Sequence, residues 1–134
     1  MHAQQLATSV QAPLIMAFSG DIGAGKTTII RAMLRALGIQ SAIKSPTFSL
    51  VESYNCDQFT VHHFDLYRIH NADELEYIGF RDFFTEQAIC CIEWAEHAGV
   101  LLPNIDVHCA LNVNGLGRDL EMKAFSALGQ KIVE

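Results

Sequence analysis

The chain has 134 residues, half of them hydrophobic, and it carries nine Lys and Arg against fifteen Asp and Glu. This length predicts a single domain over residues 1–134, because about two thirds of the unfolded surface can be buried without disulfide or metal staples. The net charge of −6 argues against a surface that follows nucleic-acid phosphates, since such binding needs clustered Lys and Arg, so direct binding of nucleic acid is not expected.

The first predicted elements are a strand, a glycine turn and a helix in series. Residues 14–19 are almost wholly apolar, which is typical of a strand covered on both faces in a parallel sheet. A glycine-rich turn occupies residues 20–25. Apolar residues then recur at helical spacing over residues 29–37, and we expect Gly38 to end that helix.

A β-hairpin is predicted next, from two β-prone runs at residues 48–54 and 60–66 with a turn between them. Alternation along the second run places His63 and Asp65 on one face of the strand and His62 on the other. The two histidines therefore point apart, and we interpret them as structural or surface residues rather than metal ligands.

The second half of the chain mixes helices and strands. Asp73 is expected to cap a helix that Gly79 breaks. Residues 89–92 form another doubly buried strand, which ends at Glu93. Two β-prone runs and a short closing helix complete the chain, at residues 105–113, 118–124 and 126–133.

The four cysteines show no spacing typical of a zinc or redox site. Cys90 and Cys91 lie side by side in an apolar run, and we interpret them as small buried residues. The sequence contains no apolar stretch of about 18 residues and no secretory signal pattern. We therefore expect no membrane association, and a cytoplasmic, thiol-reducing location.

Residues 20–27 fit the phosphate-binding pattern G-x-x-x-x-G-K-[ST], between a buried strand and an amphipathic helix. The glycines let backbone N–H groups point at phosphates, and the helix N-terminus adds positive charge. Lys26 would bridge the β- and γ-phosphates, and the Thr27 hydroxyl would be a ligand of Mg²⁺. Nucleotide contacts are expected around this loop from Asp21, Gly23, Ala24, Gly25, Lys26, Thr27 and Thr28.

This motif places the fold among the P-loop NTPase-like three-layer α/β sandwiches, with a mixed, mostly parallel sheet and an antiparallel hairpin. A P-loop also needs an acid at the end of a neighbouring strand, and both Glu93 and Asp65 qualify; either is otherwise a solvated strand-end carboxylate. Thr47 is either a loop residue or a switch-like hydroxyl for Mg²⁺. Trp94 is either a core residue or an aromatic near the nucleotide.

Several separated motifs together resemble one family, the TsaE (YjeE) ATPases. The matching segments, in chain order, are GDIGAGKTT at 20–28, SPTFSLV at 45–51, HFDLYR at 63–68, ELE at 74–76 with Gly79, and IEW at 92–94. This resemblance implies a small bacterial P-loop protein needed to make the threonylcarbamoyladenosine modification of tRNA.

The resemblance also implies roles for single residues. Lys26 and Thr27 match the family's phosphate and Mg²⁺ residues, and Thr47 matches its switch-like threonine. Asp65 matches the acid needed for ATP hydrolysis, Glu93 the Mg²⁺-site glutamate, and Trp94 an aromatic beside the nucleotide. The expected catalytic residues are therefore Asp65, Glu93 and Lys26, and the expected Mg²⁺ ligands are Thr27, Thr47, Asp65 and Glu93.

The implied activity is Mg²⁺-dependent binding and hydrolysis of ATP in support of threonylcarbamoyl transfer by TsaD with TsaB. Hydrolysis by the isolated chain is expected to be slow. Two alternatives stay open at this point. The chain is an ATP-gated docking module whose hydrolysis only resets the complex, or it is a small-molecule P-loop kinase.

Overall fold

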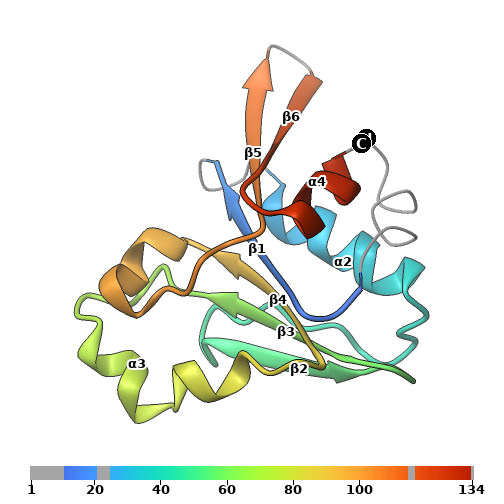
Figure 1. The fold of residues 1–134 in the computed structure, drawn as a ribbon. Helices are drawn as coiled ribbons and strands as arrows, with labels where there is room; N and C mark the ends of the chain where they lie inside the picture. The colour runs from blue at the N-terminus through green and yellow to red at the C-terminus, as the bar shows by residue number, and fades with distance from the viewer. Residues whose placement is uncertain (1–10, 21–24, 115–116, 134) are drawn as a thin grey trace.

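A computed structural model of the protein describes residues 11–20, 25–114 and 117–133. Asp21, Gly23 and Ala24, which the sequence assigns to phosphate binding, lie outside the described residues. The strands form one sheet in the order β2-β3-β4-β1-β5-β6 (Figure 1). Their bounds are Leu14–Ser19 for β1, Val51–Asn55 for β2, Thr60–Asp65 for β3, Ala88–Glu93 for β4, Val107–Asn114 for β5 and Gly117–Ala124 for β6.

The centre of the sheet is parallel and its two edges are antiparallel. β3, β4, β1 and β5 pair in parallel, β2 pairs antiparallel with β3, and β6 pairs antiparallel with β5. The expected α/β fold with a mostly parallel sheet and an antiparallel hairpin is confirmed. A second antiparallel pair, β5 and β6, lies at the opposite edge.

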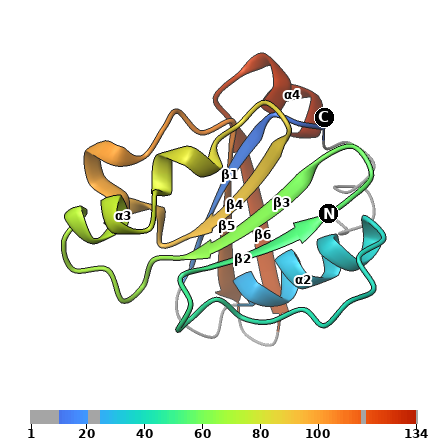
Figure 2. The same cartoon turned by 90° about the horizontal axis from the view of Figure 1, so that it is seen from below.

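Helices cover both faces of this sheet and make three layers, as Figure 2 shows for α2 and α3. The α helices are α2 (Lys26–Ala36), α3 (Asp73–Tyr77) and α4 (Ala127–Val133), and the 3₁₀ helices are η1 (Phe80–Phe83) and η2 (Ala95–Leu101). One core joins the sheet to α2 and α4, and the other joins it to α3, η1 and η2. Alternation along the strands supplies both cores, since neighbouring side chains point to opposite faces.

Two local expectations differ from the structure. The predicted strand at 48–54 begins only at Val51, because a turn precedes it, in which the Leu50 N–H donates to the Pro46 carbonyl (2.8 Å) and Leu50 has a φ of 70°. Asp73 does not cap α3; Ala72 holds the N-cap position. The turn is instead held by the Glu74 carboxylate, which accepts two backbone N–H groups from the preceding residues and so lowers the pKa of Glu74.

Other expected breaks and buried residues are confirmed. Gly79 has a φ of 70° and separates α3 from η1, while Gly38 has a φ of 97° just beyond the end of α2. Cys90 and Cys91 are both buried, and they pack into the two different cores. Within the described ranges, no helix is long and apolar enough to cross a membrane.

Candidate nucleotide and magnesium site

The candidate site lies where the central strands end and α2 begins. In the parallel ladder, Glu93 at the end of β4 stands beside Asp65 of β3 on one side and Phe18 of β1 on the other. β1 leads directly into the glycine loop, and α2 starts at Lys26. The order β3-β4-β1 therefore places both expected acids at the carboxyl ends of the central strands, where α2 begins.

Glu93 is the centre of a buried polar cluster. The Thr27 hydroxyl lies 3.2 Å from Oε1 and 3.0 Å from Oε2 of Glu93 and donates to this carboxylate. From the other side, Nε2 of His63 lies 2.7 Å from Oε2. The side chains of His63 and Glu93 are only 1% and 4% exposed. A carboxylate with so little access to water depends on these donors for its stability.

Lys26 is the cation of the site. Its residue exposure is 5%, and its ammonium donates to the Gly20 carbonyl at 2.7 Å. The same ammonium lies 4.1 Å from the centre of the Trp94 ring, within the range of a cation–π contact. Within the described residues, the Lys26 ammonium thus contacts a backbone carbonyl and an aromatic ring.

Trp94 stands between the site and one of the cores. It packs against the hydrophobic core that joins the sheet to α3, η1 and η2, while its ring faces the Lys26 ammonium. The Tyr67 ring lies 5.1 Å away and the His97 ring 5.6 Å away. Trp94 has a φ of 58°, which is uncommon for a residue other than glycine and is found often at functional sites. Trp94 therefore packs against the core, and its place beside a nucleotide stays a prediction.

A second hydroxyl–carboxylate pair lies on the neighbouring strand. The Thr47 hydroxyl donates to Oδ2 of Asp65 at 3.4 Å, and the backbone N–H of Tyr67 donates to Oδ1 at 3.0 Å. Ser45 and Thr47 join their hydroxyls at 2.9 Å. Asp65 is buried, so the loop that contains Thr47 is attached to the end of β3 through this carboxylate.

The structure thus divides the expected Mg²⁺ ligands into two pairs, Thr27 with Glu93 and Thr47 with Asp65. All four side chains offer oxygen atoms, which are the ligands that Mg²⁺ takes, commonly with one or two carboxylates and several waters or phosphates. The donor set therefore fits this ion. In the described parts of the chain, no group of three or more His, Cys, Asp or Glu is arranged to hold a metal.

The start of α2 fits an anion. Gly25 precedes the helix with a φ of 102°, and its first turn carries no acidic residue. The first N–H groups of a helix have no partner within it and favour negative charge nearby. Thr28, also expected to contact nucleotide, is exposed in this turn.

His63 belongs to this site although the sequence interpretation assigned it a structural or surface role. One signal for it was present, because alternation puts His63 on the same face of the strand as Asp65, two residues earlier. The histidine just before it, His62, lies on the other face, where its ring stands 4.9 Å from Phe83.

The buried thiols lack the chemistry of a nucleophile. Burial raises the pKa of Cys90 and of Cys109 to about 12. Cys91, which is paired with His63 in the ladder, has its pKa raised well above its usual value by the same cause. All three are therefore neutral core residues, as the sequence indicated for Cys90 and Cys91.

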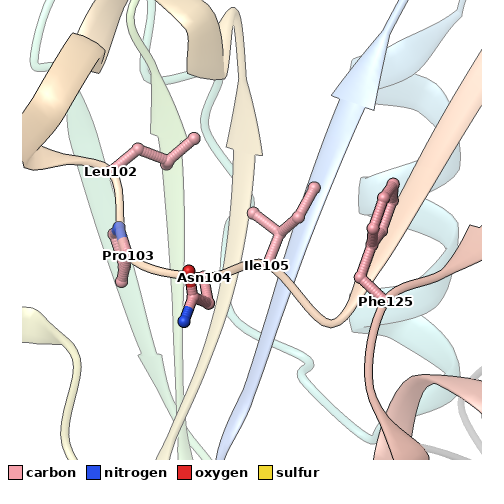
Figure 3. A pocket seen from close by; sticks show the side chains of 5 residues that line it. All are labelled: Leu102, Pro103, Asn104, Ile105 and Phe125. Carbon is pink, nitrogen blue, oxygen red and sulfur yellow. The ribbon is translucent and has the colours of Figure 1, made fainter.

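A separate hollow of about 420 Å³ lies away from this site (Figure 3). Its lining is largely apolar and comes from the segment before β5 and from the residue that follows β6: Leu102, Pro103, Asn104, Ile105 and Phe125. This segment continues into Asp106, which bonds to Ile15 near the start of β1. The hollow is thus near the amino end of the central strands, whereas ligands of parallel sheets bind at the carboxyl ends.

Comparison with known proteins agrees with the motifs. A family model described as threonylcarbamoyl adenosine biosynthesis protein TsaE matches residues 1–120. A Haemophilus influenzae protein named tRNA threonylcarbamoyladenosine biosynthesis protein TsaE is 42% identical over 120 residues, which are 90% of this chain and 76% of that protein. The Bacillus subtilis protein of the same name is 32% identical over 117 residues, or 87% of this chain and 72% of that one.

The fold has a solved counterpart. The crystal structure of Bacillus subtilis YdiB matches with a TM-score of 0.77 and covers 97% of this chain and 80% of that chain. The two sequences are 24% identical, so this likeness supports the three-layer α/β fold alone.

Proposed function

Because this chain belongs to the TsaE family, whose role is the biosynthesis of tRNA threonylcarbamoyladenosine, we propose that it binds and hydrolyses ATP with Mg²⁺ in that pathway. The observation that carries the proposal is the contact of Thr27 with Glu93 beside the buried Lys26. This arrangement joins the start of a helix that follows a glycine loop to an acid at the end of a neighbouring strand, as P-loop proteins require.

Lys26 and the start of α2 would hold the phosphates. In the structure the Lys26 ammonium uses one of its three donors on the Gly20 carbonyl and faces the Trp94 ring. A triphosphate offers this ammonium a stronger, charge-assisted hydrogen bond than a carbonyl does. The exchange of one partner for the other is therefore favourable, and it would change the environment of Trp94.

Thr27 and Glu93 would hold Mg²⁺, and Thr47 with Asp65 would add oxygen atoms beside it. Bound there, Mg²⁺ neutralises charge on the phosphates during transfer to water. Asp65 is held by the Thr47 hydroxyl and the Tyr67 N–H. With one oxygen held by each donor, its carboxylate is oriented to act on a water molecule as a general base or positioning group.

The partners of this activity would be the TsaD and TsaB proteins, with no direct contact to tRNA. The charge supports this arrangement, because a chain with a formal net charge of −6 is a poor partner for RNA phosphates. Hydrolysis in the isolated chain would be slow if partners complete the site.

The test is ATP turnover by the isolated chain, and by the chain mixed with TsaB and TsaD, for the wild type and for Asp65→Asn. We expect Asp65→Asn to bind ATP with the wild-type affinity and to lose hydrolysis by about 100-fold or more, the usual effect of a general base. A matched control is Asp82→Asn, an exposed acid of η1 on the other face of the sheet. Failure of the folded wild type to bind ATP with Mg²⁺ would overturn the proposal.

A second candidate, the ATP-gated docking module, is favoured by Phe48. This side chain is 81% exposed in the segment that contains Thr47, and the Arg68 guanidinium lies 4.2 Å from its ring centre. The contact of Thr47 with Asp65 links this exposed surface to the site. Under this reading, Asp65→Asn would still dock with TsaB and TsaD and support a first round of tRNA modification, and it would stop there because the complex is not reset. If the variant supports no round at all, hydrolysis is part of the modification itself.

A further inference from the structure

His63 and His62 are neighbours in β3 with opposite surroundings. His62 is half-buried, and its Nδ1 lies 2.7 Å from the Ser53 hydroxyl on the side of the sheet away from the site. His63 is 1% exposed and points at the carboxylate of Glu93. Only the second of these rings touches a residue of the candidate site.

We propose that His63 is a positioning residue, which holds Glu93 in the orientation that binds Mg²⁺ together with Thr27. Nε2 of His63 is 2.7 Å from Oε2 of Glu93, a short distance for this type of hydrogen bond. A carboxylate that binds Mg²⁺ only accepts hydrogen bonds, so in this role Nε2 of His63 would be the donor. The inference rests on the proposed use of Mg²⁺ and ATP by this chain.

The other ring nitrogen shows that packing alone does not explain this residue. Nδ1 of His63 is buried, and in the part of the chain that the structure describes it has no hydrogen-bond partner. A buried polar atom without a partner lowers stability. An apolar side chain would fill the same space without this cost, so the contact with Glu93 is what the imidazole adds.

The position of His63 suits this role better than that of Thr27. β3 and β4 are hydrogen-bonded over six residue pairs, which fixes the backbone of His63 relative to Glu93. The Thr27 hydroxyl contacts both oxygens of Glu93, but it would give up these bonds on turning to Mg²⁺. Among the described side chains His63 would then hold the carboxylate alone. Hydrogen bonds of this kind orient metal ligands and tune metal affinity.

The experiment compares two amide variants that differ only in reach. In His63→Gln the amide nitrogen can lie near the place of Nε2, whereas in His63→Asn it lies near Nδ1 and falls short of Glu93. The control is His62→Asn, the neighbour on the other face. For each variant we would measure by calorimetry the dissociation constant of a non-hydrolysable ATP analogue, once with excess Mg²⁺ and once with EDTA.

The dissociation constant in EDTA divided by that in Mg²⁺ reports how strongly Mg²⁺ strengthens nucleotide binding. We expect His63→Asn to reduce this ratio by about 10- to 100-fold, the usual cost of losing a partner of a metal ligand. His63→Gln should keep most of the ratio, His62→Asn all of it, and the EDTA constants should be alike. The emission of Trp94, the single tryptophan, gives a second readout beside Lys26.

Three outcomes would contradict the inference: a wild-type ratio in His63→Asn, an equal loss in the Gln and Asn variants, or a loss of binding in EDTA as large as that with Mg²⁺. Thermal unfolding of each variant shows whether it is folded, and His63→Leu, which fills the space without a donor, takes the place of His63→Asn if that variant does not fold. A wild type that binds no analogue would instead overturn the proposed function, so the two failures are distinguishable.

Discussion

The paired strands β3 and β4 present side chains of opposite character on their two faces. On the face toward α2, His63, Asp65 and Glu93 bury polar groups and bind one another or the hydroxyls of threonines. On the other face, Phe64 is surrounded by the rings of η1 and the residue after it, with Phe80 at 5.2 Å, Phe83 at 5.3 Å and Phe84 at 6.0 Å.

This difference separates chemistry from stability within one pair of strands. Packed rings contribute to the free energy of folding, while buried charges that are held only by hydrogen bonds add little or nothing to it. A change on the ring face should therefore alter stability and leave nucleotide affinity unchanged. A change on the polar face should alter nucleotide affinity, and it should lower stability only where it leaves a buried charge without a partner.

The largest effect should follow from Phe64→Ala. Its side chain is fully buried at the centre of the ring cluster, so we expect the free energy of unfolding to fall by about 3–5 kcal/mol. Urea unfolding measures this loss. Nucleotide affinity of the folded variant at low temperature should equal that of the wild type, and a large change in affinity would show that the faces are not independent.

The reaction rates of the cysteines should show whether water and reagent reach the side chains buried in the two cores. Burial raises the pKa of Cys90 and Cys109 from 9.0 to about 12, so their thiolate fraction falls about a thousandfold, tenfold for each pKa unit. We expect an aromatic disulfide reagent at pH 8 to modify only half-buried Cys56 quickly, and all four cysteines after denaturation. Rapid reaction of a second thiol in the native chain would show that water reaches one face.

Lys26→Ala should lower the affinity for ATP without lowering the stability of the fold. Losing a hydrogen bond to a charged group costs about 1.5–3 kcal/mol, which lowers ATP affinity about 10- to 100-fold. The midpoint of thermal unfolding should stay close to that of the wild type, because among the described residues the ammonium contacts just the Gly20 carbonyl and the Trp94 ring. Lys131→Ala, in the last turn of α4, is the control. Equal affinities for the wild type and Lys26→Ala would contradict both the site and the comparison.

The smallest effect should come from His62, through pH. Burial lowers the pKa of His62 below 6.5 in the folded state, so the unfolded chain binds the proton more readily. Its contribution to stability is complete above pH 6.5 and is lost as the pH falls through the folded pKa. The wild type should therefore lose more stability than His62→Asn between pH 7 and pH 5, by less than about 1 kcal/mol at this partly exposed site. A difference that grows in the other direction would contradict the shift.

Local patterns were enough to predict the elements on which the site is built. The apolar run of β1, the glycine loop and the stripe of α2 are signals within about 25 residues, and alternation along β3 and β4 assigns each side chain to a face. The end of β4 at Glu93 follows from the same pattern. Both strands of the second antiparallel pair were predicted, at residues 105–113 and 118–124, but their pairing was not stated. The N-cap at Ala72 was missed, because short-range signals leave competing caps open.

Only the tertiary structure decided which side chains meet. Thr27 and Glu93 are 66 positions apart in the chain, and their contact depends on β4 lying between β1 and β3. No periodicity records strand order, so the sequence could not pair Thr27 with Glu93, Thr47 with Asp65 or Lys26 with Trp94. For the same reason His63 was assigned no site role until the sheet placed it beside Glu93. The sequence by itself determined the chemistry available to this protein, and the packing of the sheet determined how that chemistry is assembled.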